Sequence, residues 1–125
     1  MKDDNIIQQK SYQFAMQIVI SYRWLCEEKK EFVLSKQLVR CATSIGANVE
    51  EAIGGQSDKD FLSKLSIAYK EAREANYWLR LLTDTDYLPM EKSQPLMIAS
   101  EEIQKILGSI IKTVKSKQSQ KIPNS

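Results

Sequence analysis

Apolar residues recur every three or four positions along four stretches of this chain, which is the spacing of an amphipathic α-helix. Charged residues, glycines and prolines separate these stretches and end helices. The pattern predicts helices over about residues 5–29, 33–53, 58–84 and 91–117, followed by a flexible polar tail over residues 118–125. Because the connections are short, we predict an all-α, antiparallel up-down-up-down four-helix bundle, formed by residues 1–117 as a single domain.

The predicted helix boundaries have local reasons. Gly54 and Gly55 end the second helix because glycine accepts the left-handed conformation that closes helices. Ser57 resembles the N-cap of the third helix, with an aspartate three residues later in the place of the usual glutamate of a capping box. The fourth helix begins between Pro89 and Pro95, since proline is tolerated in a first helical turn.

A second apolar stripe lies on the outer side of two helices. At about 100° per residue, one group of residues lies opposite the core-facing side of the first helix, and another lies away from the core of the third. The residues are Tyr12, Met16, Ile20 and Trp24 in the first helix, and Ile67, Trp78 and Leu81 in the third. Single exposed apolar residues are normal, but ordered stripes are typical of interaction surfaces. We therefore predict a homo-oligomer that associates through these residues.

Polar residues follow one face of the second helix beside its apolar stripe. Polar groups near a core need partners, because an unsatisfied buried one costs about 1–3 kcal/mol. The planar guanidinium of Arg40 suits a carboxylate of the third helix, or a phosphate. We interpret these residues as a polar network that fixes the register of the bundle. The network comprises Arg40, Ser44, Asn48, Glu51, Glu71 and Glu74.

Composition limits the chemistry. The chain has no histidine, which excludes Ser-His-Asp and Cys-His catalysis and the carboxylate–histidine di-metal sites of helical bundles. Cys26 and Cys41 are isolated, so they indicate neither a disulfide framework nor a zinc site. We expect a non-enzymatic protein without cofactor or metal. Acid–base work by Glu51, Glu71 and Glu74 is the least favoured alternative.

The net charge of +2 is unevenly placed, because no acidic residue follows Glu102. Residues 1–104 carry −3, and the C-terminal segment carries +5. Its lysines are candidate RNA or DNA contacts, although lysines also suit the C-terminal end of a helix dipole. The candidates are Lys105, Lys112, Lys115, Lys117 and Lys121, with Arg23, Arg40, Arg73 and Arg80 as further cations.

We expect no targeting segment, since the first residues are acidic. Its aliphatic runs are far too short for a membrane span. We expect a cytoplasmic protein without membrane contact.

Several motifs occur in an order that is specific in combination: QLVRCATSIGANVEE over residues 37–51, SDKDF over 57–61, KEA over 70–72 and YWLRLL over 77–82. In these motifs the chain resembles the bacterial four-helix bundle family whose founders are encoded in intervening sequences of 23S ribosomal RNA genes. The resemblance covers about residues 10–114. It implies an antiparallel bundle that assembles into a ring-like homopentamer. It also implies kinship with the accessory proteins of diversity-generating retroelements, which bind nucleic acid and a reverse transcriptase.

Two functions stay open for such an oligomer. In the first, the bundle binds RNA, DNA or a nucleic-acid enzyme through the basic C-terminal segment. In the second, the ring is a scaffold that presents a surface to another protein. The scaffold needs no strong basic patch, which suits the acidic body of this chain.

Overall fold

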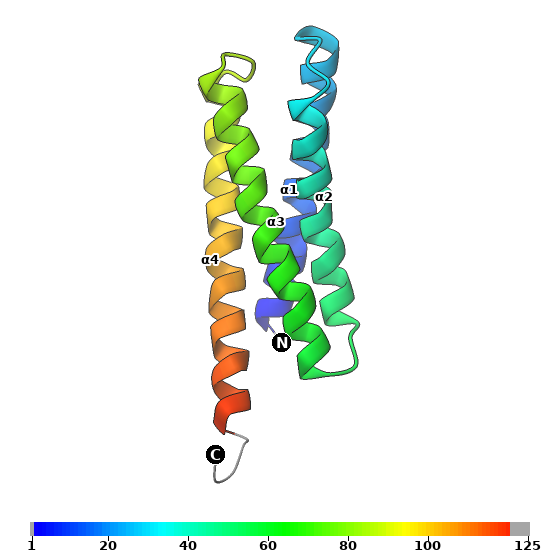
Figure 1. Cartoon of the computed structure of the whole chain (residues 1–125), viewed down its shortest axis with the longest axis vertical. Helices are drawn as coiled ribbons and strands as arrows, with labels where there is room; N and C mark the ends of the chain where they lie inside the picture. Colours follow the sequence, from blue (N-terminus) through cyan, green and yellow to red (C-terminus); the bar gives the residue numbers. More distant parts are fainter. Residues whose placement is uncertain (1, 121–125) are drawn as a thin grey trace.

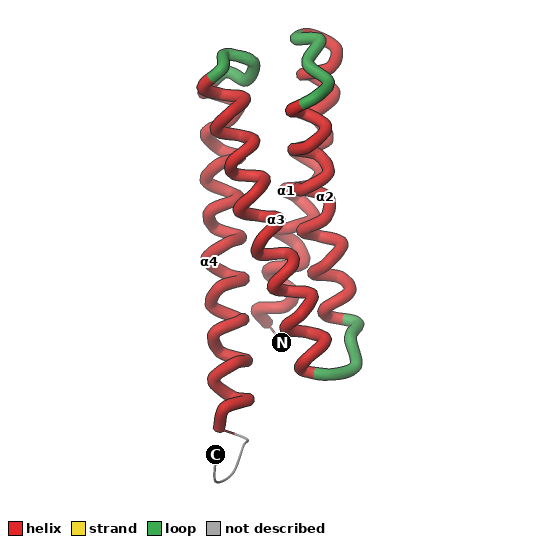
Figure 2. Tube along the Cα trace, in the orientation of Figure 1, coloured by secondary structure: helices red, strands yellow, loops and turns green. Residues whose placement is uncertain are grey.

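Four long helices account for most of the chain. The computed structural model describes the backbone of residues 2–120 and the side chains of residues 6–120. The helices are α1 (Lys2–Glu28), α2 (Leu34–Ile53), α3 (Asp58–Asp84) and α4 (Met90–Gln120). Figure 2 shows these helices joined by short loops, and residues 2–120 contain no strand. The prediction of an all-α chain with four helices is confirmed.

The helices lie side by side, and each packs against two others. The α1–α2 and α3–α4 connections lie at the upper end of Figure 1, and the α2–α3 connection lies at the lower end. Both α1 and α3 pack against α2 and α4, but within the described residues they make no close backbone approach to each other. Therefore α1 and α3 occupy opposite corners of the bundle.

The core is formed by the inward stripes that the apolar spacing predicts. Phe14 of α1 is among the largest fully buried side chains, at 1% exposure. Three buried alanines, Ala68, Ala72 and Ala75, follow the inner face of α3. Their short side chains let α3 lie close to its neighbours, because the distance between packed helices depends on the side chains at the contact.

Two helices end on residues in the left-handed conformation that are not glycine. Lys30 follows α1 with φ 53°, and Asp86 follows α3 with φ 67°. The amide of Glu31 donates to the carbonyl of Leu25, and the amide of Leu88 donates to the carbonyl of Leu82. At the end of α3 the amide of Tyr87 also donates to the carbonyl of Leu82, and the amide of Asp86 donates to that of Thr83, which is the hydrogen-bond pattern of a Schellman motif. At both ends these bonds satisfy carbonyls that the helix leaves without a partner.

The reason given above for the end of α2 is wrong. Gly54 has φ −82°, and neither it nor Gly55 is left-handed. Gly55 has a different role, because a Cβ atom there would lie 2.5 Å from Oδ2 of Asp60 and 3.1 Å from the carbonyl oxygen of Ala52. A side chain at position 55 would therefore crowd Asp60 and the Ala52 carbonyl in the turn into α3, and glycine avoids this crowding. The predicted N-cap is confirmed, since Ser57 Oγ accepts from the amide of Asp60 at 3.1 Å.

The outer ends of α1 and α4 extend beyond their predicted bounds. Helix α4 continues to Gln120, so residues 118–120 of the predicted tail are helical, and residues 121–125 lie outside the described residues. Neither glycine nor proline interrupts residues 115–120, and lysine and glutamine are good helix formers. The last turns of α4 project past the α2–α3 connection (Figure 1).

Helix α2 begins at a buried carboxylate that the hydrophobic pattern does not reveal. Glu31 is 7% exposed. Its Oε1 accepts from the amides of Val33 and Leu34 at 3.1 and 2.8 Å, and its Oε2 accepts from the amide of Ser35 at 2.8 Å. The hydroxyl of Ser35 donates back to the Glu31 carbonyl at 2.8 Å. Glu31 therefore satisfies the amides that the first turn of α2 leaves without helical partners.

We expect this carboxylate to make stability depend on acid pH. Burial raises the pKa of Glu31, but the hydrogen bonds from Ser35, Leu34 and Val33 outweigh burial and hold the pKa below its ordinary value of 4.5. The stabilisation is complete above the unfolded-state pKa and is lost as pH falls through the lower folded-state pKa. Urea unfolding between pH 7 and pH 3 should show Glu31→Gln less stable than the wild type at pH 7 by about 1–2 kcal/mol, with the difference shrinking towards pH 3. A difference that does not vary with pH would contradict this role.

Candidate functional site

The polar residues of α2 meet α3 in one cluster, which we call the Arg40–Glu74 cluster and which comprises Arg40, Cys41, Glu71, Glu74 and Trp78. A single oxygen, Oε2 of Glu74, lies at its centre. It accepts from Nη2 of Arg40 at 2.6 Å, from Sγ of Cys41 at 3.0 Å and from Nε1 of Trp78 at 3.0 Å. Nη1 of Arg40 lies 3.5 Å from Oε2 of Glu71. One carboxylate thus connects two residues of α2 to the indole of α3.

The helical geometry explains why these side chains meet. Glu71, Glu74 and Trp78 are separated by three and four residues, so they share one flank of α3. Cys41 is fully buried, and the adjacent Arg40 is exposed. An indole N–H near a core needs an acceptor, and the glutamate one turn earlier supplies it.

The electrostatics of the cluster favour fixed charge states. Hydrogen bonds from Cys41 and Trp78, together with the charge of Arg40, lower the pKa of Glu74. Burial, followed by the hydrogen bond to Glu74, raises the pKa of the Cys41 thiol far above its ordinary value. An ionised Glu74 and a protonated Cys41 are therefore stable at neutral pH, and neither is poised for proton transfer.

The cluster also has the composition of a weak cation site. Sγ of Cys41 and carboxylate oxygens of Glu71 and Glu74 lie within 4.8 Å of one another. Oε2 of Glu71 is buried and accepts no hydrogen bond within the described residues. The guanidinium of Arg40 already pairs with both carboxylates, and thiolate ligation would require Cys41 to lose its proton. The geometry therefore favours a structural tie between α2 and α3.

The structure does not join the remaining predicted network residues to this cluster. The amide of Asn48 donates to the carbonyl and to Oγ of Ser44, at 2.8 and 3.1 Å, within α2 itself. Oε2 of Glu51 lies 3.5 Å from Nζ of Lys64, in a separate ion pair. Glu51 therefore does not pair with Glu71 and Glu74 as the carboxylate-enzyme alternative requires. Asn48 finds its partners one turn away on its own helix, so it needs none from another.

The second apolar stripe of α1 is exposed along most of its length. Tyr12, Met16 and Ile20 are 63%, 47% and 65% exposed. Trp24, at the end of the stripe, is partly buried, and Nζ of Lys92 in α4 lies 4.8 Å from its ring centroid. These residues cover the outer side of α1, away from the core residue Phe14.

The stripe of α3 is less exposed. Ile67 is 39% exposed, while Trp78 and Leu81 are partly buried. Trp78 belongs to the Arg40–Glu74 cluster as well, a role that the apolar pattern missed. The signal was present in the sequence, since a glutamate stands four residues before the tryptophan.

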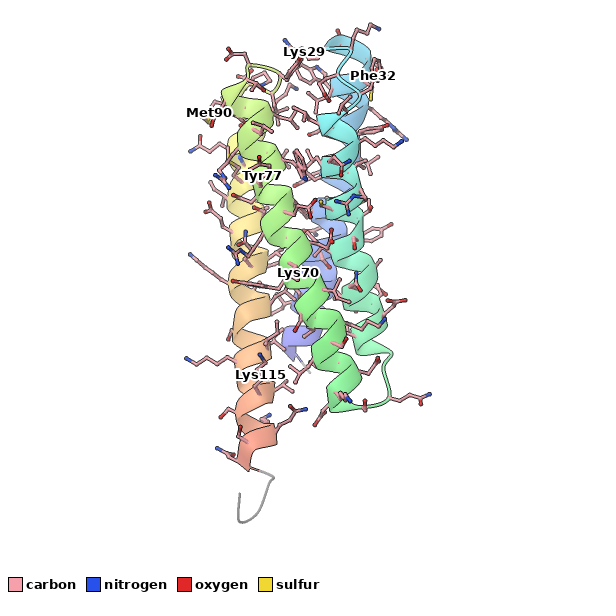
Figure 3. All side chains as sticks on the ribbon, in the orientation of Figure 1. Lys29, Phe32, Lys70, Tyr77, Met90 and Lys115 are labelled. Atoms are coloured by element: carbon pink, nitrogen blue, oxygen red, sulfur yellow. The ribbon has the colours of Figure 1, made fainter. Side chains whose placement is uncertain are left out.

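The C-terminal lysines are exposed but do not form one row. At about 100° per residue, Lys105 and Lys112 lie on the outer face of α4, whereas Lys115 and Lys117 point to different sides. Lys115 lies near the projecting end of α4 in Figure 3. Lys121 lies outside the described residues.

A basic groove between α3 and α4 was not predicted as a site. It has a volume of about 440 Å³ and is lined by Lys70, Arg73, Tyr77 and Arg80 of α3, with Gln104 of α4 among its other residues. Figure 3 shows Lys70 and Tyr77 along the middle of α3. The four α3 residues are spaced by three, four and three positions, which in a helix places them on one flank. On the sequence alone, only Arg73 and Arg80 among them were named, as separate cations.

The comparison with protein families decides the relationship of this chain. The family model described as "23S rRNA-intervening sequence protein" matches residues 3–109. The chain belongs to this family. The predicted resemblance is thereby confirmed.

A solved structure supports the fold of this 23S rRNA-intervening sequence family member. It is a crystal structure of a protein with unknown function from the S23 ribosomal protein family of Bacteroides thetaiotaomicron. The two chains share 51% sequence identity with a TM-score of 0.86, over 88% of this chain and 98% of the other. No curated protein matches the chain. No helix in the described part of the chain combines the length and apolar character needed to span a bilayer.

Proposed function

We propose that this family member is a non-enzymatic, cytoplasmic scaffold. Its protomer is an antiparallel up-down-up-down bundle, and several protomers associate into a ring-like homo-oligomer. The observation that carries the proposal is the row of exposed apolar residues on the outer side of α1, where Tyr12 and Ile20 are each more than 60% exposed. An amphipathic helix of a monomeric bundle is polar on that side.

The positions of the two stripes favour a ring. Helices α1 and α3 stand at opposite corners, so the outer stripe of α1 and the α2-facing stripe of α3 are different surfaces on different sides of the bundle. Contact between two unlike surfaces is heterologous, and such contacts close into a ring when the rotation between neighbours permits. The family resemblance adds the expectation of five subunits.

The Arg40–Glu74 cluster and the repetition of surfaces in a ring support the scaffold role. That cluster fixes α3 against α2 and holds Trp78 in place within its stripe. A ring presents its remaining faces in several copies, which raises the avidity for a protein partner with repeated binding sites. This mode of action requires no catalytic group.

The oligomeric state is the direct test. Size exclusion with multi-angle light scattering, at about 10 and 100 μM protein, should give a mass that is a multiple of the 14.4 kDa protomer. A mass of 14.4 kDa at both concentrations would contradict the proposal.

Binding of RNA or DNA is a second candidate function. Lys105, Lys112, Lys115 and Lys117 are exposed on α4, and the end of this helix projects beyond the bundle (Figure 1). Projecting cations favour phosphate contact, and such contact weakens steeply with salt. Substitutions of these lysines, compared with substitutions in the groove between α3 and α4, show which of the two surfaces binds nucleic acid.

A further inference from the structure

The groove between α3 and α4 has its cations on one flank of a helix, whereas the C-terminal lysines of α4 point to different sides. Lys70, Arg73 and Arg80 lie on one flank of α3, over ten residues or about 15 Å of helix. Lys70 and Arg73 are exposed and have no ion-pair partner within the described residues. The charges of these two residues therefore stabilise the fold through no ion pair within the described residues.

The acidic residues near the groove do not cancel this charge. Glu74 lines the groove, but its Oε2 is held by Arg40 on the side that faces α2. Glu101 lines the adjoining depression, where Lys105 is also present. The groove therefore keeps an excess of cations.

An aromatic ring lies between these cations. Tyr77 is 48% exposed, and the guanidinium carbon of Arg80 lies 5.8 Å from its ring centroid. Tyr77 makes an edge-to-face contact with Trp78, with ring centroids 5.1 Å apart, and this contact restricts its ring. Nε of Arg80 donates to Oδ1 of Asn76 at 3.1 Å, and Nδ2 of Asn76 donates to Ser100 of α4 at 2.8 Å. The ring and the guanidinium are thus positioned in advance.

We propose that this groove binds single-stranded nucleic acid. The cations contact successive phosphates, and an unpaired base stacks on Tyr77 and the Arg80 guanidinium, which is the combination that single-strand binding surfaces use. The side chain of Gln104 makes no hydrogen bond within the described residues, so its amide is available to the edge of a base. An acidic peptide would use the cations but has no group that needs the exposed ring.

The proposal takes its class of partner from the second candidate function and assigns it to a different surface. It does not depend on self-association, because the groove belongs to one protomer. A protein that is monomeric by light scattering could therefore still bind single strands, and an oligomer could fail to bind them.

The test uses fluorescence anisotropy with the full-length protein and labelled 12-nucleotide oligo(U), oligo(dT) and a 12-base-pair duplex. At 50 mM salt we expect both single strands to bind, and to bind more tightly than the duplex. Lys70→Gln with Arg73→Gln should weaken single-strand binding at least about tenfold and reduce the magnitude of the salt slope by about 1.4, as expected for two lost phosphate contacts. Tyr77→Leu should weaken single-strand binding about tenfold, because the base loses its stacking partner.

The matched control removes two exposed lysines from the end of α4, as Lys112→Gln with Lys115→Gln. We expect this variant to change the affinity less than about threefold, and circular dichroism should show every variant folded. Equal losses in the groove and control variants would overturn the assignment to the groove. So would no binding at 50 mM salt, an affinity for the duplex equal to that for single strands, or binding of polyglutamate as tight as that of the oligonucleotides.

Discussion

Replacing Met16 and Ile20 together by glutamate is expected to convert the protein into a 14.4 kDa monomer. The two residues lie one turn apart on the outer side of α1 and are 47% and 65% exposed in the protomer. In an oligomer they would be buried, and two carboxylates without partners would have to lose their hydration there. We expect association to weaken at least about 100-fold, while the helical circular dichroism of the protomer is kept.

The control places the same two carboxylates at the same spacing on another helix. Thr43 and Ala47 are exposed on the outer face of α2, so Thr43→Glu with Ala47→Glu adds equal charge outside both stripes. Light scattering after size exclusion should give the wild-type mass for this variant and the protomer mass for Met16→Glu with Ile20→Glu. Dissociation of both variants would indicate a general effect of charge and would sink the assignment of the interface to α1.

Replacing Phe14 by alanine is expected to lower the free energy of unfolding by about 3–5 kcal/mol. Phe14 is 1% exposed at the centre of the inner face of α1. Removal of the ring forfeits its burial and leaves a cavity that long, packed helices close only in part. Since small domains are stable by only about 5–15 kcal/mol, this is a large fraction of the total.

Phe32 supplies the matched control for this substitution. It lies in the α1–α2 connection at the upper end of the bundle, and it is 57% exposed (Figure 3). Phe32→Ala removes the same ring, and its effect should stay within about 0.5 kcal/mol. Urea denaturation should be followed at one protein concentration, because association contributes to apparent stability. A loss for Phe14→Ala as small as the loss expected for Phe32→Ala would contradict the role of Phe14 in the core.

The helices and the core were predictable because burial in a bundle repeats with the period of the helix. Phe14, Leu79 and Leu107 are buried where the spacing of apolar residues predicts. Helix ends were less predictable, since they depend on single hydrogen bonds. Glu31 reads in the sequence as part of a charged loop, yet its carboxylate caps α2.

The Arg40–Glu74 cluster was likewise predictable in part. The pairing of Arg40 with carboxylates of α3 follows from opposite charge and matching helix faces, and the structure contains it. That Cys41 and Trp78 donate to the same oxygen depends on the distance and rotation between α2 and α3. Spacing along one helix carries no information about that relation. Asn48 lies outside the cluster because its side-chain amide donates to Ser44, one turn earlier in α2, and not to a residue of α3.

By itself, the sequence determined the four helices, the inward stripes, the second apolar stripe of α1 and the family. Each of these is written in residues close together along the chain, where the helical period relates position to direction. Only the tertiary structure decided which polar groups share partners, what a side chain at position 55 would crowd, and that α3 and α4 form a basic groove around Tyr77. These features join residues from two helices, and they depend on how closely the helices pack and how they are rotated about their axes.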